Sequence, residues 1–190
     1  HIKITDPESG EVLIDKRNAI HYENMSIALA ESLANAGQGP IYKMAFGNGG
    51  TSVDPTGIIT YLTPNSTGTN ASLYNQTFNK VVDDQASNNT DPVRNKIETR
   101  HVSGTNYTDI LISCLLDYGE PSGQDAFDTT TNTENLYVFD ELGLISAGAS
   151  GTDGRLLTHV IFHPVQKSLN RLIQIDYTVR VQSLTGFNEV

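Results

Sequence analysis

Residues 172–182, LIQIDYTVRVQ, contain the longest strict alternation of apolar and polar side chains in the sequence. The apolar members share one side of an extended backbone, and they are Ile173, Ile175, Tyr177, Val179 and Val181. Eleven residues at the rise of a β-strand reach roughly 36 Å, about twice the usual strand length. We therefore predict a long, half-buried strand that spans its sheet or projects beyond it, with Tyr177 in the middle of its core face.

A second strand is predicted just upstream of this one. Residues 156–162 form an apolar run, and Asp153-Gly154 before it is a turn signal. His163-Pro164 follows the run, and we expect it to end that strand because proline lacks a backbone N–H. Residues 137–182 therefore predict a strand, a turn, a strand, a broken connection and the long strand.

Further runs of strand length occur upstream, bounded by residues that favour turns. They are residues 2–4, 12–14, 41–46, 58–62, 97–102, 110–116 and 136–139. The first two flank Asp6-Pro7-Glu8-Ser9-Gly10, which predicts an N-terminal hairpin. Together the runs predict a mainly β fold, an antiparallel β sandwich or barrel of about seven to nine strands with one packed α-helix and long polar loops.

The one predicted helix lies near the N-terminus. Its evidence is a stripe of apolar residues at helical spacing, namely Tyr22, Met25, Leu29, Leu33 and Ala36. Asn18 is suited to cap its start and Gly37 to end it. Because such a stripe far more often packs in a core than lines a binding groove, we interpret it as the face by which the helix is buried.

Length and charge limit the class of protein. The 190 residues suit a single β-rich structural domain over 1–190. The formal net charge of −10 repels phosphate backbones and anionic lipid, and no apolar run approaches the ~20 residues of a membrane helix. We therefore expect no nucleic-acid and no membrane partner, and the sequence shows no export leader. The lone Cys114 lies in an apolar run, where we expect it to pack as a small hydrophobe.

Six glycosylation sequons occur, at Asn24, Asn65, Asn70, Asn75, Asn88 and Asn106. Such triplets arise by chance in a chain rich in Asn, Ser and Thr. With no leader and no cysteine pair, we favour an unglycosylated protein.

Two polar segments separate the strands of the N-terminal half. Gly47-Asn48-Gly49-Gly50-Thr51 lacks the Lys-Ser/Thr end of a phosphate-binding loop and the spacing of a dinucleotide fingerprint. We therefore expect a sharp turn between residues 41–46 and 58–62, with the glycines at positive φ, rather than a nucleotide site. Residues 63–91 are almost all Asn, Ser, Thr, Gly and Asp, which predicts a long arm or loop whose few apolar residues dock elsewhere and which serves a partner.

Two histidines are the first residues to consider for a metal site. His159 and His163 lie four apart, which in a strand places both on one face. Neither has a carboxylate or cysteine companion at metal-ligand spacing. We therefore favour structural or interface histidines.

The acidic residues give no stronger signal. Asp140-Glu141, and Asp117 with Glu120, are pairs suited to acid–base work, yet no Ser, Cys or Lys stands in a nucleophile context. Two further acidic groups, Asp83-Asp84 and Asp125 with Asp128, lack the ligand count of a calcium loop. We assign no catalytic, cofactor-binding or metal-binding residue, and we expect no cofactor and no enzymatic activity.

Charge is unevenly distributed in the C-terminal half. Residues 101–154 hold nine acids and no Lys or Arg, whereas residues 155–190 hold four basic residues against two acids. The two segments can neutralise each other within one fold or between neighbouring copies. Because the long strand and the polar arm offer edges that a neighbour can cover, we expect a homo-oligomer in a symmetric ring or array.

Several motifs occur in one order along residues 40–182. They are Phe46-Gly47-Asn48-Gly49-Gly50-Thr51, Leu73-Tyr74-Asn75, Phe139-Asp140-Glu141-Leu142-Gly143-Leu144, Gly154-Arg155-Leu156-Leu157, and Lys167 ahead of the final strand. The series resembles the N-terminal domain of tail-collar fibre proteins of tailed bacteriophages, and more widely the virion structural proteins of contractile-tailed phages. The resemblance implies a β-rich module that attaches to the particle. The chain ends at Val190, where a fibre would continue into a shaft and tip, which favours a small virion component over a host adhesin.

The resemblance therefore implies a non-enzymatic structural component of a tailed-bacteriophage virion, assembled in the host bacterial cytoplasm. The expected protein is a collar/neck or tail (baseplate) attachment protein that assembles with copies of itself and with other virion structural proteins. One alternative is a capsid decoration protein on the head surface, which shares the expected fold. An alternative of another class is a β-barrel metal-dependent enzyme that uses His159 and His163, which would lose stoichiometric metal on His159→Ala.

Overall fold

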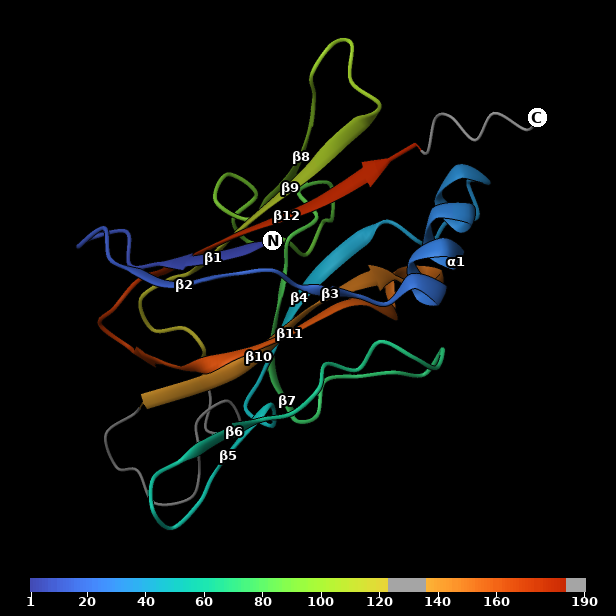
Figure 1. The fold of residues 1–190 in the computed structure, drawn as a ribbon. Coiled ribbons are helices and arrows are strands. Elements are labelled where there is room, and N and C mark those ends of the chain that lie inside the picture. The colour runs from blue at the N-terminus through green and yellow to red at the C-terminus, as the bar shows by residue number, and fades with distance from the viewer. Residues whose placement is uncertain (123–135, 184–190) are drawn as a thin grey trace.

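The computed structural model describes residues 1–122 and 136–183 (Figure 1). Its elements in chain order are β1 (Ile2–Thr5), β2 (Val12–Lys16), β3 (Ala19–Ile20), α1 (Tyr22–Leu33), β4 (Ile41–Gly47), β5 (Thr51–Val53), β6 (Ile59–Tyr61), β7 (Gln76–Val81), β8 (Lys96–His101), β9 (Tyr107–Leu116), β10 (Leu136–Ala147), the 3-10 turn η2 (Ala149–Gly151), β11 (Asp153–Ser168) and β12 (Ile173–Gln182).

These strands form two five-stranded sheets and a separate hairpin. One sheet has the order β2-β1-β12-β9-β8, the other has the order β3-β11-β10-β4-β7, and β5 pairs with β6. Neighbouring strands are antiparallel in each pair. The predicted mainly β, antiparallel fold with one helix is thus confirmed. The described residues contain twelve strands, more than the seven to nine expected, and the sheets do not close into a barrel.

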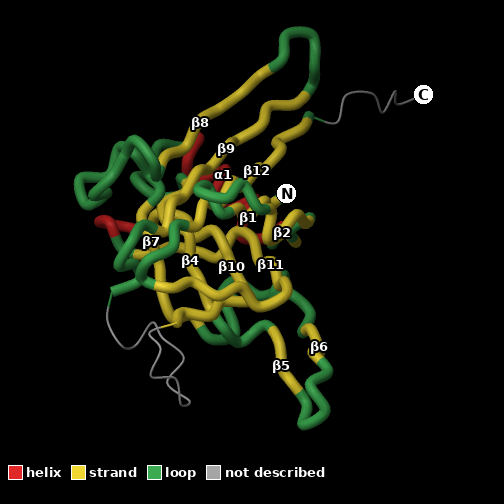
Figure 2. The backbone as a smooth tube through the Cα atoms, turned by 90° about the vertical axis from the view of Figure 1, so that its left-hand side faces the viewer, coloured by secondary structure: helices red, strands yellow, loops and turns green. Residues whose placement is uncertain are grey.

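The predicted long strand is β12, and it lies at the centre of the first sheet. Tyr177 is opposite Ile2 of β1 on one side and Ile112 of β9 on the other. The alternate residues Ile173, Ile175 and Tyr177 are buried, as the sequence pattern predicts. The ends of β8, β9 and β12 extend beyond the second sheet, and the β5–β6 hairpin points away from both sheets (Figures 1 and 2).

The main core fills the space between the two sheets. Side chains of β1, β9 and β12 meet side chains of β4, β10 and β11 there, and the core includes five of the six largest fully buried residues: Tyr137, Tyr177, Phe46, Phe139 and Phe162. Cys114 belongs to this cluster, and burial raises the pKa of its thiol to about 12. The prediction that Cys114 packs as a hydrophobe is therefore confirmed.

The expected break at His163-Pro164 is wrong, because β11 runs without interruption from Asp153 to Ser168. The register passes from Phe139 opposite Val165 to Glu141 opposite Ile161. Three residues of β11, Phe162 to Pro164, thus face one residue of β10. Pro164 is tolerated because this bulge interrupts the ladder where the missing N–H would otherwise be needed.

The helix is confirmed, but its cap and its buried face are not as predicted. His21, not Asn18, caps α1 by accepting a hydrogen bond from Asn24 N at 3.2 Å. The helix ends at Leu33, before Gly37, because the chain turns into a left-handed conformation at Asn35.

The interpretation of the helical stripe as a core face is wrong. Asn24 and Ala28 are the buried residues of α1, whereas Tyr22 and Leu33 are 79% and 88% exposed. Asn24 donates its side-chain amide to Leu156 O at 2.9 Å, so a polar bond fixes the helix to β11. Most of the apolar stripe is consequently left at the surface.

Residues 63–91 are not an arm over their whole length. Residues 76–81 form β7, an edge strand paired with β4, and Leu73 and Val82 are buried. Leu73 packs in a small second cluster with Ala45, Ile145 and Leu156 on the outer side of the second sheet. The segment before β7 therefore covers that side of the sheet.

Among the described residues, one acid of segment 101–154, Asp109, pairs with a basic residue of segment 155–190, whereas Asp117, Glu120 and Asp153 pair with basic residues nearer the N-terminus. Arg180 donates to both carboxylate oxygens of Asp109, at 2.7 and 3.0 Å, and Arg171 pairs with Asp6 at 2.9 Å. Over the described ranges, no helix is long and apolar enough to cross a membrane.

Candidate functional site

The most unusual polar feature is a pair of buried carboxylates, Asp140 and Glu141, in the middle of β10. Consecutive residues of a regular strand point to opposite faces. Here the bulge of β11 lies opposite Asp140, and both carboxylates reach the glycine-rich segment 49–51. The local irregularity of the sheet therefore brings two neighbouring acids to one place.

Glu141 accepts four hydrogen bonds from three distant parts of the chain. Its Oε1 accepts from Gly49 N at 3.1 Å and from Asn75 N at 2.8 Å. Its Oε2 accepts from Tyr74 N and from His159 Nε2, both at 2.9 Å. Burial raises the pKa of Glu141, but these hydrogen bonds outweigh burial and hold the pKa below its ordinary value.

His159 is held in one tautomer by its two partners. Its Nδ1 accepts the backbone N–H of Asn65 at 2.8 Å, so the ring proton must lie on Nε2, where it is donated to Glu141. The ring also lies near Tyr74, with 5.6 Å between ring centres. His159 therefore acts as a neutral connector between the carboxylate and the segment that covers the sheet.

Asp140 fastens the start of the β5–β6 hairpin. Its carboxylate accepts from Gly50 N at 2.9 Å, from Thr51 N at 2.8 Å and from the Thr51 hydroxyl. Burial raises the pKa of Asp140 above its ordinary value, and the hydrogen bonds from Thr51 and Gly50 only partly offset it. The two adjacent acids thus have pKa values shifted in opposite directions.

The glycines of this segment serve close approach, not positive φ as expected. Gly47, Gly49 and Gly50 are not among the glycines with left-handed backbones. A Cβ at Gly49 would instead lie 2.8 Å from Asn75 N and from Tyr74 Cβ. The glycine-rich segment also does not lead directly into β6. β5 lies between them in the sequence and pairs with β6.

This arrangement binds the chain to itself. Every oxygen of the two carboxylates already accepts at least one hydrogen bond, and His159 has no exposed surface. No group of three or more His, Cys, Asp or Glu able to hold a metal ion occurs in residues 1–122 and 136–183. The chemistry that these residues perform best is therefore to fasten three loops to a sheet.

His159 and His163 do not share one face, contrary to expectation. His159 is buried against Glu141, whereas His163 lies in the bulge at the surface, with Nδ1 3.3 Å from the Tyr61 hydroxyl. The extra residues of the bulge break the two-residue period that would align them. The histidine pair expected for a metal-dependent enzyme is thus not formed.

The other candidate acids have separate roles. Asp117 pairs with Arg94, and Glu120 pairs with Lys80, so both are used in ion pairs. Asp83 and Asp84 lie at the rim of an apolar groove. Asp125 and Asp128 lie outside the described residues.

The Asn24 side chain of the first sequon is buried and donates to Leu156 O at 2.9 Å, so its amide nitrogen is not accessible to a glycan. That the remaining triplets arose by chance stays a prediction.

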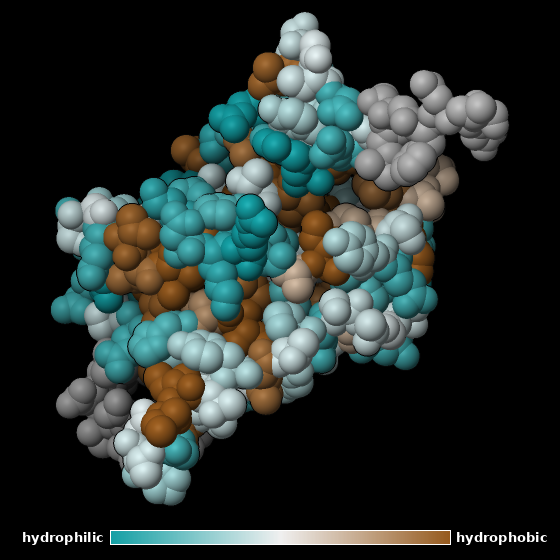
Figure 3. All heavy atoms as spheres, viewed as in Figure 1, coloured by the Kyte–Doolittle hydropathy of each residue, from teal (hydrophilic) through white to brown (hydrophobic). Residues whose placement is uncertain are grey.

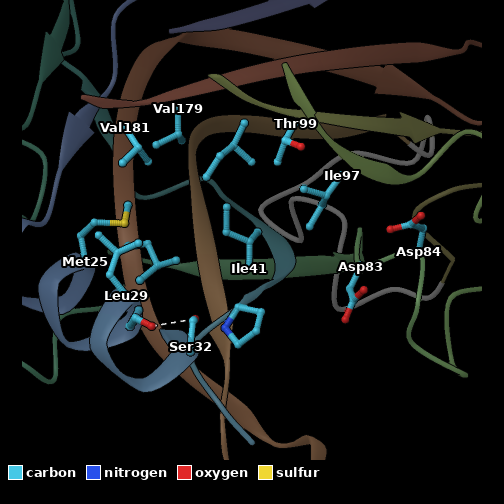
Figure 4. Close-up of a pocket in the computed structure, with 15 residues that line it drawn as sticks. Met25, Leu29, Ser32, Ile41, Asp83, Asp84, Ile97, Thr99, Val179 and Val181 are labelled. Carbon is cyan, nitrogen blue, oxygen red and sulfur yellow. Dashed lines mark hydrogen bonds between the residues drawn. The ribbon is translucent and has the colours of Figure 1, made fainter. Parts of the chain in front are cut away.

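A groove of about 410 Å³ lies between α1 and the projecting part of the first sheet (Figure 4). Met25 and Leu29 of α1 line one wall, and Ile97, Val179 and Val181 line the other. The sequence contained the signal for this groove in the helical stripe. Met25 and Leu29 of that stripe line the groove.

Comparison of the chain with protein-family models, with curated proteins and with solved structures returned no match. The sequence motifs contain Thr51 and Tyr74, but nothing in the sequence connected them with the two carboxylates. The role of Asn65 had no signal in the sequence.

Proposed function

We propose that this chain is a non-enzymatic structural component of a tailed-bacteriophage virion. In this proposal it is a collar, neck or tail (baseplate) attachment protein that assembles with copies of itself and with other virion structural proteins.

One observation carries the proposal: three of the motifs that resemble the tail-collar family meet at one carboxylate. Glu141 belongs to the motif at 139–144, and it accepts hydrogen bonds from Gly49 of the first motif and from Tyr74 and Asn75 of the second. Weak motifs that occur together by chance have no reason to build one buried network. Their meeting supports the interpretation of the series as a structural signature.

The use of the buried acids also supports a structural role. A carboxylate that accepts several main-chain hydrogen bonds orders loops and is not available to a substrate. Glu141 and Asp140 together hold residues 49–51 and 74–75. Rigid loops on a rigid sandwich suit a protein whose task is to present fixed surfaces to neighbours in an assembly.

The proposal is tested on particles. Phages from a lysate of cells that carry the gene are purified by density gradient, and the chain is sought by mass spectrometry and by immunogold electron microscopy. We expect the chain in intact particles at a constant copy number, with gold at the neck or tail. Antibody adsorbed with purified chain is the control.

Two outcomes would change the conclusion. Gold over the head surface would favour a capsid decoration protein instead. A chain that is abundant in the lysate but absent from the particles would refute a virion role.

A further inference from the structure

Two groups of exposed apolar residues occur in the described part of the molecule. One group lies on the β5–β6 hairpin, where Val53, Ile58, Tyr61 and Leu62 are between 42% and 63% exposed (Figure 3). The other group lies on α1 and beside it, and includes Leu29 and Val181, which line the groove. Contiguous exposed apolar surface on a soluble domain marks an interaction site.

The hairpin is a projecting and ordered element. Its turn is fixed by Asp54, whose Oδ1 accepts from Thr56 N at 2.8 Å, from the Thr56 hydroxyl at 2.6 Å and from Ile58 N at 3.0 Å. Gly57, at φ +87°, completes the turn. Because the tip is ordered before any contact forms, docking would cost little conformational entropy.

The groove is concave, and none of residues 1–122 and 136–183 fills it. Its walls are apolar side chains of α1, β4, β8, β9 and β12, and its rim carries Asp83 and Asp84. Within the described part of the chain, neither acid has a basic residue within ion-pair distance, and their side chains accept hydrogen bonds only from Gln85. The groove is therefore apolar inside and negative at its edge.

The base of the hairpin carries the opposite charge. Lys16 is exposed, its Nζ lies 5.8 Å from the centre of the Tyr61 ring, and it donates to Ile161 O at 2.7 Å. The turn of the hairpin carries the exposed acid Asp54, so the match lies in the apolar side chains that flank the turn and in Lys16 at the base, against an apolar groove with two aspartates at its rim.

We propose that the β5–β6 hairpin of one copy docks in the groove between α1 and the β8–β9–β12 end of a second copy. The hairpin and the groove lie at opposite ends of the molecule, so one copy cannot satisfy both within itself (Figures 1 and 2). A convex element that fits a concave one on the next copy makes a head-to-tail contact, which closes into a ring when the rotation permits. This inference rests on the proposed assembly role and names the surfaces that copies of the chain use.

The size of the contact predicts weak association of the free protein. Residues 51–62 number twelve, whereas a stable interface uses roughly 20–30 residues a side. Association should therefore be concentration-dependent in solution and should be reinforced in the particle, where several contacts act together.

Sedimentation velocity of the full chain, up to about 0.5 mM, tests the contact at the weak end of specific association. Ile58→Glu alters the hairpin, and Leu29→Glu alters the groove without lowering helix propensity. Each should weaken self-association at least about tenfold, because a charge would be buried in an apolar contact. Leu169→Glu is the control, because Leu169 is 38% exposed, close to the 39% of Leu29, but belongs to neither surface.

A mixture of the two variants is the decisive measurement. Ile58→Glu retains an intact groove and Leu29→Glu retains an intact hairpin. An equimolar mixture should therefore form dimers with the affinity of the unaltered contact. It should not form larger oligomers, because each dimer has no second intact pair of surfaces. A monomeric unaltered chain at every concentration would overturn the inference. Equal weakening by Leu169→Glu, or a mixture that forms no dimer, would overturn it as well. None of these results would decide whether the chain is present in particles, so failure of the contact and failure of the virion role are distinguishable.

Discussion

His159 Nε2 lies 2.9 Å from Glu141 Oε2, and neither side chain has any exposed surface. The neutral imidazole completes a set of four donors around one carboxylate. Removing the charge of Glu141 should therefore cost far more than removing a surface acid.

Glu141→Gln should lower the free energy of unfolding on the order of 3 kcal/mol at pH 7, because the amide nitrogen would face N–H donors. Asp140→Asn should cost less, about 1 kcal/mol, since burial already disfavours the charge of Asp140. Urea unfolding of both variants provides the measurement. Equal losses for the two variants would show that the hydrogen bonds of Glu141 contribute no more to the free energy of unfolding than those of Asp140.

The same two variants should change the acid dependence of stability in opposite directions. The lowered pKa of Glu141 contributes stability that is present above its unfolded pKa and is lost as pH falls through its folded pKa. The raised pKa of Asp140 acts in the opposite direction, because the folded state binds its proton more tightly. Between about pH 6 and 3.5, stability should therefore fall less steeply in Glu141→Gln and more steeply in Asp140→Asn than in the unaltered chain.

Tyr177→Ala should lower the free energy of unfolding by roughly 3 to 5 kcal/mol, because the side chain is buried between the sheets. Tyr177→Phe should cost only about 1 kcal/mol, since it removes the hydrogen bond from the Tyr177 hydroxyl to Thr158 Oγ1, which is 2.7 Å long. Thr158 keeps its bond from Leu144 N in that variant. Chemical unfolding of both variants separates the contribution of the buried ring from that of the hydroxyl hydrogen bond. A loss below roughly 0.5 kcal/mol for Tyr177→Ala would contradict the assignment of Tyr177 to the core.

Lys167 should make stability rise with pH above neutrality. Burial lowers the pKa of its ammonium group from 10.5 to about 8, so the unfolded chain binds the proton more tightly than the folded chain between these values. Over that window its contribution to stability should grow by roughly 3 kcal/mol. The difference in unfolding free energy between the unaltered chain and Lys167→Met, followed from about pH 7.5 to 10.5, isolates this effect. Cys114 is common to both proteins, so its ionisation cancels in the difference.

Gly47→Ala should lower the free energy of unfolding by about 1 to 3 kcal/mol. A methyl group there would lie 2.5 Å from Glu141 Oε1 and against Asn75 O. Because both residues belong to one network, the double variant Gly47→Ala/Glu141→Gln should lose less than the sum of the single variants. Strict additivity would mean that the glycine is needed for another reason.

Hydrogen exchange should divide residues 63–91 into protected and unprotected parts. The amides of Asn65, Tyr74 and Asn75 are bonded to the carboxylate site, and the strand at 76–81 is paired with β4. These amides should exchange slowly, whereas the exposed polar residues between them should exchange fast. Rapid exchange throughout would restore the interpretation of the segment as a free arm.

Periodicity alone determined which side of β12 lies in the core. The alternation in residues 172–182 indicated the buried side of β12, because a strand that covers a core on one face must alternate whatever its neighbours are. The apolar run at 110–116 and the N-terminal hairpin followed from equally local signals. The mainly β class needed no tertiary information.

Only the tertiary structure decided which residues of each apolar pattern are buried. The stripe on α1 has helical spacing, but whether it is buried depends on how far the sheets extend beneath it, and here Asn24 and Ala28 take the contact. Likewise, Asp140, Glu141 and His159 became one site only because a bulge in β11 and a loop 66 residues from Glu141 in sequence meet on one sheet. Local sequence determines the conformation of a segment through short-range sterics and burial period. The meeting of distant segments depends on register and packing, which no single stretch of the sequence encodes.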